Sequence, residues 1–132
     1  MRIASILALA LFCSALPDAQ APQPGPDAAT IQRGKLAYVT WCTPCHGSNP
    51  AGRGRFGGTG FPGTDALAVK YRGRQPPVPA ALEQRSDLTS ATIKLVVRQG
   101  VSVMPFFRKT EISDTDLDAL IAYLLSLRPA TR

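Results

Sequence analysis

The segment Cys42-Thr43-Pro44-Cys45-His46 constrains this chain more than any other part of its sequence, and His46 is its only histidine. A disulfide across two intervening residues would close only a very short loop. A structural zinc site needs about four ligands, more than these two thiols and one imidazole supply. A thioredoxin-like dithiol would need a strand-rich fold, and the sequence shows no strand pattern. C-x-x-C-H is the attachment signature of haem c, so we expect one haem bound covalently through Cys42 and Cys45.

The two axial ligands of that haem are predicted to be His46 and Met104. Thiols three residues apart lie on one side of an incipient helical turn, which presents the next residue, His46, to the iron. A lone methionine is often a flexible core filler. Met104, however, is the only methionine besides the initiator, precedes Pro105 and follows His46 by 58 residues. No second histidine competes, and a lysine ligand (Lys70, Lys94 or Lys109) would first have to lose its proton.

Residues 1–21 have the composition of a secretory signal peptide: Met1-Arg2, an apolar stretch from Ile3 to Leu16, then small residues up to Ala21. The apolar stretch is shorter than the ~20 residues that span a bilayer. We expect cleavage between Ala15 and Ala21 and a periplasmic protein with no membrane span afterwards. Cys13 as a lipoprotein acceptor is the alternative, although bulky Leu11-Phe12 precedes it.

The remaining chain divides into a proline-rich tether at 22–26, one domain at 27–128 and a short tail at 129–132. No strand alternation or internal repeat stands out, so the sequence predicts an all-α domain. Its first helix begins after the N-cap Asp27 and leads into Cys42, with Ile31, Gly34, Tyr38 and Trp41 on one face. The glycine-rich stretch from Gly47 to Gly63 excludes regular helix.

Three further helices are predicted. Thr64-Asp65 could cap a short helix that runs through Tyr71, before the break at residues 75–79. Thr89 could cap a second, with an αL stop at Gly100. Residues 100–110 then form a loop that carries Met104. The last helix starts at Ser113, in a capping box with Asp116, and ends at Pro129. Its apolar stripe comprises Leu117, Leu120, Ile121, Leu124 and Leu127.

From residue 27 to residue 127 the sequence resembles class I c-type cytochromes. Gly34 and Tyr38 stand eight and four residues before Cys42, where that family has a glycine and an aromatic residue, and Leu120 and Tyr123 match its C-terminal pair. The resemblance implies a cytochrome c fold, in which the N- and C-terminal helices cross around one covalently bound haem. A proline carbonyl, from Pro62 or Pro50, would orient the ligating histidine.

Residues 63–123 also look loosely like the cytochrome subunits of periplasmic dehydrogenases, including flavin-dependent alkylphenol hydroxylases. The formal charge is +6, and it stays +6 without residues 1–21, which hold one cation and one anion. An acidic redox partner is therefore expected, and nucleic acid is not. The basic residues of the middle loops either steer docking or form a solvated face: Arg53, Arg55, Lys70, Arg72 and Arg74. Tyr71 and Arg72 are the predicted haem-propionate contacts.

The predicted function is electron transfer by a single haem c cycling between Fe(II) and Fe(III), from a periplasmic dehydrogenase to a respiratory acceptor. Two axial ligands and the absence of a second catalytic constellation predict an electron-transfer protein and not an enzyme, although the chain could be a tightly held cytochrome subunit of a dehydrogenase complex. The alternative is a haem enzyme, or a gas or peroxide sensor, in which Met104 is displaceable. That reading lacks a distal histidine for acid-base chemistry.

Overall fold

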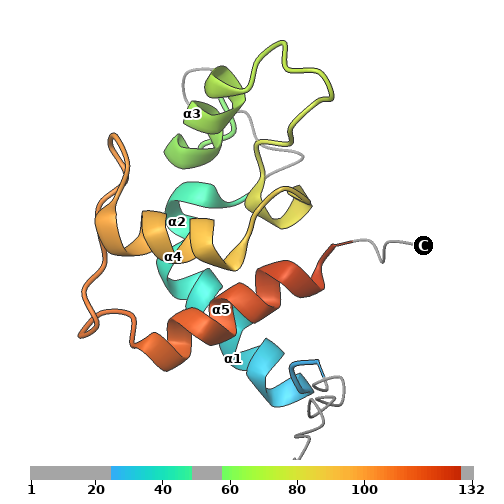
Figure 1. The fold of residues 1–132 in the computed structure, drawn as a ribbon. Coiled ribbons are helices and arrows are strands. Elements are labelled where there is room, and N and C mark those ends of the chain that lie inside the picture. Colours follow the sequence, from blue (N-terminus) through green and yellow to red (C-terminus); the bar gives the residue numbers. More distant parts are fainter. Residues whose placement is uncertain (1–24, 49–57, 129–132) are drawn as a thin grey trace, which may run out of the picture.

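The computed structural model describes residues 25–48 and 58–128, and its architecture is all-α, as predicted (Figure 1). Within these ranges the only β-type pairing is an isolated bridge between Val101 and Met104. No helix in the described ranges is long and apolar enough to cross a membrane. The elements are α1 (Ala28–Trp41), α2 (Thr43–His46), α3 (Pro62–Lys70), a 3-10 turn (Leu82–Gln84), α4 (Ser90–Gln99) and α5 (Asp114–Ser126).

Three helices begin at the side chains predicted to cap them. Asp27 accepts a hydrogen bond from the Thr30 amide at 2.7 Å in α1. In α4 and α5, the hydroxyls of Thr89 and Ser113 each accept from the backbone amide three residues later, at 3.1 Å in both cases. Such caps satisfy amides that have no partner inside the helix and stabilise it by about 1 kcal/mol each. The capping predictions for these helices are confirmed.

The start predicted for the short middle helix was wrong. Helix α3 begins at Pro62, two residues before Thr64, because proline is pre-organised for the first helical position and needs no amide partner there. Thr64 and Asp65 therefore lie inside the first turn. The Thr64 hydroxyl donates to the carbonyl of Gly47 at 2.9 Å, and Asp65 accepts from the Thr59 amide at 2.8 Å. The helix ends at Lys70, with Tyr71 as its C-cap.

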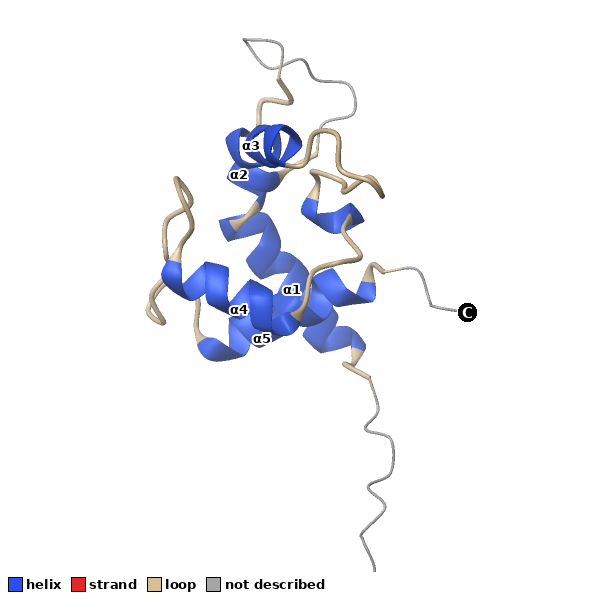
Figure 2. Ribbon diagram, turned by 45° about the horizontal axis from the view of Figure 1, so that its top comes forward, coloured by secondary structure: helices blue, strands red, loops and turns tan. Residues whose placement is uncertain are grey.

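Helices α1 and α5 cross and pack against each other, with α2 and α3 at the opposite end of the molecule (Figure 2). A Cβ at Gly34 would lie 1.9 Å from the carbonyl oxygen of Ala119, so only glycine allows this approach. Beside it, the rings of Tyr38 and Tyr123 pack with centroids 5.6 Å apart. Leu120 is 1% exposed. The predicted crossing of the N- and C-terminal helices is confirmed.

Two helix ends differ from expectation. Gly100 does follow the last residue of α4 with a positive φ of 70°, but its ψ of 172° is outside the αL region that was predicted. Helix α5 stops at Ser126, and Leu127 is 42% exposed, so it does not belong to the buried stripe. The other predicted members of that stripe are buried: Leu117, Leu120, Ile121 and Leu124.

Candidate functional site

Of the two cysteines of the C-x-x-C-H segment, Cys42 lies at the junction of α1 and α2, and Cys45 lies within α2. The Cys42 amide donates to the Tyr38 carbonyl at 2.9 Å, while the Cys42 carbonyl accepts from the amides of Cys45 and His46 at 3.0 and 2.7 Å. Cys42 therefore ends one helix and begins the next. Both thiols are free. Burial, with a smaller contribution from Cys45, raises the pKa of Cys42 to about 12, so this half-buried thiol is protonated at neutral pH.

His46 is contacted by two helices, by α1 at its backbone carbonyl and by α3 at its ring. Burial lowers the pKa of its imidazole, so the ring is neutral at physiological pH, as an iron ligand must be. Its backbone carbonyl accepts a hydrogen bond from the Tyr38 hydroxyl at 3.2 Å. A Cβ at Gly63 would lie 2.6 Å from Cε1 of the ring, so glycine allows α3 to approach the imidazole closely.

The Nδ1 atom of His46 is buried and has no hydrogen-bond partner among the described residues. The Pro62 carbonyl therefore does not accept a hydrogen bond from His46. The prediction that Pro62 orients the histidine through its carbonyl is not met in this structure. Pro62 is instead the first residue of α3, where its carbonyl faces into the helix. The other candidate, Pro50, lies outside the described residues.

Backbone hydrogen bonds shape the loop that carries Met104. The amides and carbonyls of Val101 and Met104 pair with each other at 3.1 and 2.9 Å, which makes a tight turn. The Phe107 amide then donates to the Val97 carbonyl at 2.8 Å and returns the chain to α4. Gly100 permits this closure, because a Cβ there would lie 2.7 Å from the Met104 carbonyl oxygen.

Met104 is half-buried and packs against the hydrophobic core, as does Cys42. The core that both residues border is formed by α1, α4, α5 and the segment before α5: Tyr38, Ile93, Val97, Ile112, Leu117, Leu120, Ile121, Tyr123 and Leu124. The structure thus brings the methionine loop and the cysteine segment against the same apolar body, although they are far apart in the sequence.

Of the two residues predicted to contact propionates, Tyr71 is half-buried and Arg72 is exposed. The Tyr71 hydroxyl accepts from Nη2 of Arg85 at 3.3 Å, and the Arg85 guanidinium lies 4.5 Å from the centroid of the same ring. Sequence reasoning missed Arg85, whose side chain is only 6% exposed and forms a bidentate pair with Asp87. A buried guanidinium is rare enough to mark a structural or binding role.

These donors suit a haem better than a bare metal ion. Within residues 25–48 and 58–128, no group of three or more His, Cys, Asp or Glu side chains could hold a metal. One neutral imidazole directly after two thiols on one helical turn would suit a haem, which brings its own nitrogen ligands to the iron. Gly63 leaves the imidazole the space that a Cβ at this position would take. The residues present therefore fit the cofactor that the C-x-x-C-H segment predicts.

Comparison with protein families gives a match over most of the described chain. The model described as "Cytochrome C oxidase, cbb3-type, subunit III" matches residues 29–124, from the first residues of α1 to the last turn of α5. The chain belongs to this family. It is a c-type cytochrome, and the class I resemblance deduced from the sequence is confirmed. Searches of curated proteins and of solved structures found no match.

Membership of the family defines the general chemistry of the site. A c-type cytochrome domain binds haem c covalently and transfers electrons through it. The cysteines available for attachment are Cys42 and Cys45. The family match spans both this segment and the methionine loop.

Proposed function

We propose that this cytochrome is an exported, single-haem electron carrier with His46 and Met104 as axial ligands, that it receives electrons from a periplasmic dehydrogenase, and that it delivers them to a respiratory acceptor. Haem supplies the one-electron Fe(II)/Fe(III) couple. The observation that carries the proposal is the environment of His46, a neutral imidazole with its carbonyl bound by Tyr38 and its ring against Gly63, directly after the two cysteines.

The protein contributes to electron transfer by holding its ligands still. The Tyr38 hydroxyl and the Thr64 hydroxyl bind the carbonyls of His46 and the following Gly47, so α1 and α3 both restrain the proximal side. The closed loop around Met104 would restrain the other ligand. A rigid coordination sphere lets iron change its oxidation state with little rearrangement. A thioether ligand favours ferrous iron and raises the reduction potential relative to two imidazoles.

The proposed partner surface is basic. Lys70, Arg72 and Arg74 are all exposed and follow one another at the end of α3 and in the next turn; Arg53 and Arg55 lie outside the described residues. Such a group of cations favours an acidic redox partner and neutralises propionates. Tyr71 and Arg72 remain the proposed propionate contacts, and the buried Arg85 is a third candidate. The family description names a subunit of a terminal oxidase, which favours a respiratory acceptor.

The test starts with the holoprotein, produced with its leader in a host that matures cytochromes c. A pyridine haemochrome assay should give one haem per chain, and the ferric protein should show the weak long-wavelength absorption band of methionine ligation. Met104→Ala should abolish that band, and Met104→Leu should do the same while it preserves apolar volume. Retention of the band in both variants would overturn the ligand assignment.

Carbon monoxide distinguishes a carrier from a sensor or enzyme. The ferrous wild-type protein should bind carbon monoxide slowly, because Met104 occupies the iron, while Met104→Ala should bind it rapidly. Rapid binding by the wild type would favour the enzyme or sensor alternative. Co-purification with a dehydrogenase or an oxidase at high salt would identify a held subunit rather than a diffusing carrier. Amino-terminal sequencing of the mature protein would locate the cleavage site predicted between Ala15 and Ala21.

A further inference from the structure

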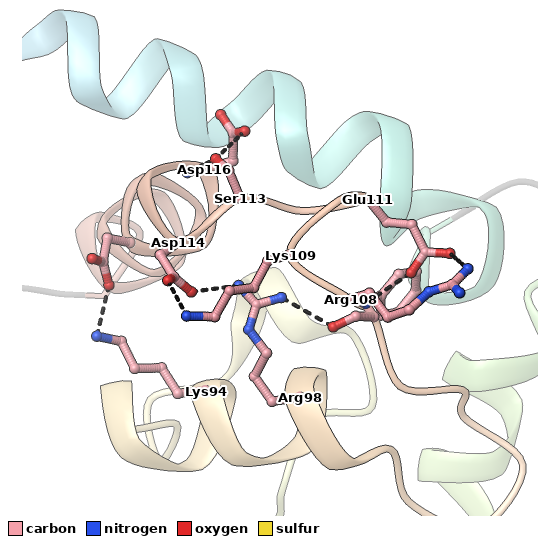
Figure 3. Close-up of polar contacts among 10 residues, drawn as sticks. Lys94, Arg98, Arg108, Lys109, Glu111, Ser113, Asp114 and Asp116 are labelled. Atoms are coloured by element: carbon pink, nitrogen blue, oxygen red, sulfur yellow. Dashed lines mark hydrogen bonds and ion pairs between the residues drawn. The ribbon is translucent and has the colours of Figure 1, made fainter.

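The loop that carries Met104 is tied to both flanking helices by one side chain, Arg98, near the C-terminus of α4 (Figure 3). Its Nη1 atom donates to the backbone carbonyl of Phe107 at 3.0 Å, and its Nη2 atom donates to Oδ1 of Asp114 at 2.9 Å. Asp114 is the first residue of α5. One guanidinium therefore bridges α4, the end of the methionine loop and the start of α5.

Several features give this bridge its stiffness. The side chain of Arg98 is only 22% exposed, and its bond to the Phe107 carbonyl is partly shielded from water, whereas its bond to Asp114 lies at the surface. Asp114 is also paired with Lys109, whose Nζ lies 2.6 Å from Oδ2, and these two bonds lower the pKa of Asp114, with Lys109 the larger cause. A carboxylate in the first turn also interacts favourably with the helix dipole. Asp114 therefore stays ionised and keeps the guanidinium in place.

The contact with the Phe107 carbonyl matters because of where the loop closes. The loop leaves α4 at Gly100 and returns when the Phe107 amide binds the Val97 carbonyl at 2.8 Å. Arg98 binds the carbonyl oxygen of the same residue, Phe107. Both polar groups of Phe107 are thus held by α4. Because Met104 lies between these two closure points, its position depends on them.

We propose that Arg98 is a positioning residue for Met104: its bridge between the Phe107 carbonyl and Asp114 closes the methionine loop and keeps the thioether in reach of the iron. This inference rests on the proposed function, in which Met104 is the sixth ligand. Arg98 acts through the loop and does not touch the haem ligand itself. Its guanidinium has the forked geometry needed to serve two acceptors at once, which a lysine cannot reproduce.

The chain contains a matched control. Lys94 and Asp118 form another ion pair between α4 and α5, with 2.7 Å between Nζ and Oδ1, and both side chains are more than half exposed. Figure 3 shows Lys94 beside Arg98, one helical turn earlier on α4. Lys94 forms no hydrogen bond to the methionine loop in the described structure. Breaking the Lys94 pair removes a charge and an interhelical contact but leaves the loop closure intact.

The experiment titrates ferric holoprotein with imidazole, which binds iron only when the methionine leaves, and follows loss of the long-wavelength band. Arg98→Met retains the aliphatic stem and should bind imidazole about tenfold more tightly than wild type, the effect expected from a lost charge-assisted hydrogen bond. Arg98→Lys should lie near Arg98→Met. Lys94→Met should match the wild type within about twofold.

The outcomes separate this inference from the proposed function. If Met104→Ala abolishes the band but Arg98→Met binds imidazole like the wild type, the Arg98 inference is overturned and methionine ligation stands. If the band survives in Met104→Ala, the ligand assignment itself fails. If Arg98→Met does not fold, Asp114→Asn provides the second variant: it removes the negative charge from one acceptor of the bridge while an amide oxygen can still accept, and it should tighten imidazole binding in the same direction by a smaller factor. An unchanged affinity there would also overturn the inference.

Discussion

Replacement of Gly34 by alanine tests the helix crossing directly. The added Cβ would lie 1.9 Å from the Ala119 carbonyl oxygen, 2.4 Å from its carbonyl carbon and 2.9 Å from the Leu120 amide nitrogen. An ordinary Cβ contact needs at least 3.4 Å, and all three atoms belong to the α5 backbone, which no side-chain rotation can move away. The two helices must therefore separate where their packing is tightest.

The magnitude follows from two opposing effects. Alanine in place of glycine favours a helix by about 1 kcal/mol. Overpacking of a core costs about 1–3 kcal/mol when side chains can adjust, and a backbone clash belongs at or above the upper end of that range. We expect Gly34→Ala to lower the free energy of unfolding by about 2 kcal/mol or more, a large share of the ~5–15 kcal/mol that stabilises a typical domain.

The assay is guanidinium chloride unfolding of the holoprotein, followed by circular dichroism in the far ultraviolet. Two controls isolate the crossing. Gly25→Ala adds a methyl group where nothing lies within 4 Å, and Gln32→Ala changes an exposed position on the same helix. Both should stay within about 0.5 kcal/mol of the wild type. A Gly34→Ala protein as stable as the controls would refute the reasoning, because it would mean that α1 and α5 do not approach as closely as described.

Two further predictions concern hydrogen bonds. Tyr38→Phe removes the 3.2 Å hydrogen bond to the His46 carbonyl, so it should destabilise the holoprotein by about 1 kcal/mol and alter the haem absorption spectrum. The control Tyr123→Phe should leave the spectrum unchanged. Equal spectra for the two variants would contradict a specific role for Tyr38. The hydrogen bond from Arg85 is the largest cause that holds the pKa of Asp87 below its ordinary value of 3.8. The stability it gives is therefore complete above that pH and is lost as pH falls through the lower folded value. Asp87→Asn should cost about 1 kcal/mol at pH 7, since half the carboxylate is exposed, and urea unfolding should show this difference shrinking below pH ~4; a difference that persists there would count against the pair.

Local signals in the sequence predicted much of the fold. The N-caps of three helices were predicted correctly: Asp27, Thr89 and Ser113. A short polar side chain just before a run of periodic apolar residues binds an amide only three residues away, so this signal is local in the sequence. The same locality explains the error at α3: Pro62 and Thr64 are both good starting residues, and the sequence alone does not reveal that Thr64 is needed by the Gly47 carbonyl. The long-range hydrogen bond from Thr64 to Gly47 therefore accompanies a helix that starts at Pro62, although either residue could start it locally.

The site was predicted less evenly. Cys42, Cys45 and His46 could be named because haem attachment imposes a fixed spacing within five residues. Arg85 and Arg98 carried no such signal. Arg85 is buried against Tyr71, which lies 14 residues earlier, and the partners of Arg98 lie 9 and 16 residues later. An arginine in a basic chain looks like a solvated surface residue until the folded neighbours are known.

Because α1 is continuous, the number of residues between Gly34 and Cys42 determines the direction around the helix axis in which Cys42 faces. Gly34 lies within α1 and Cys42 is its C-cap, eight residues later, which places the two positions about 12 Å apart along the helix axis. One residue inserted between them would turn the thiols by about 100° about that axis while the glycine stayed against α5. The attachment segment would then face another side of the domain. The chain before Gly34 can change in length without this effect, whereas between Gly34 and Cys42 each residue sets the direction in which the haem is held.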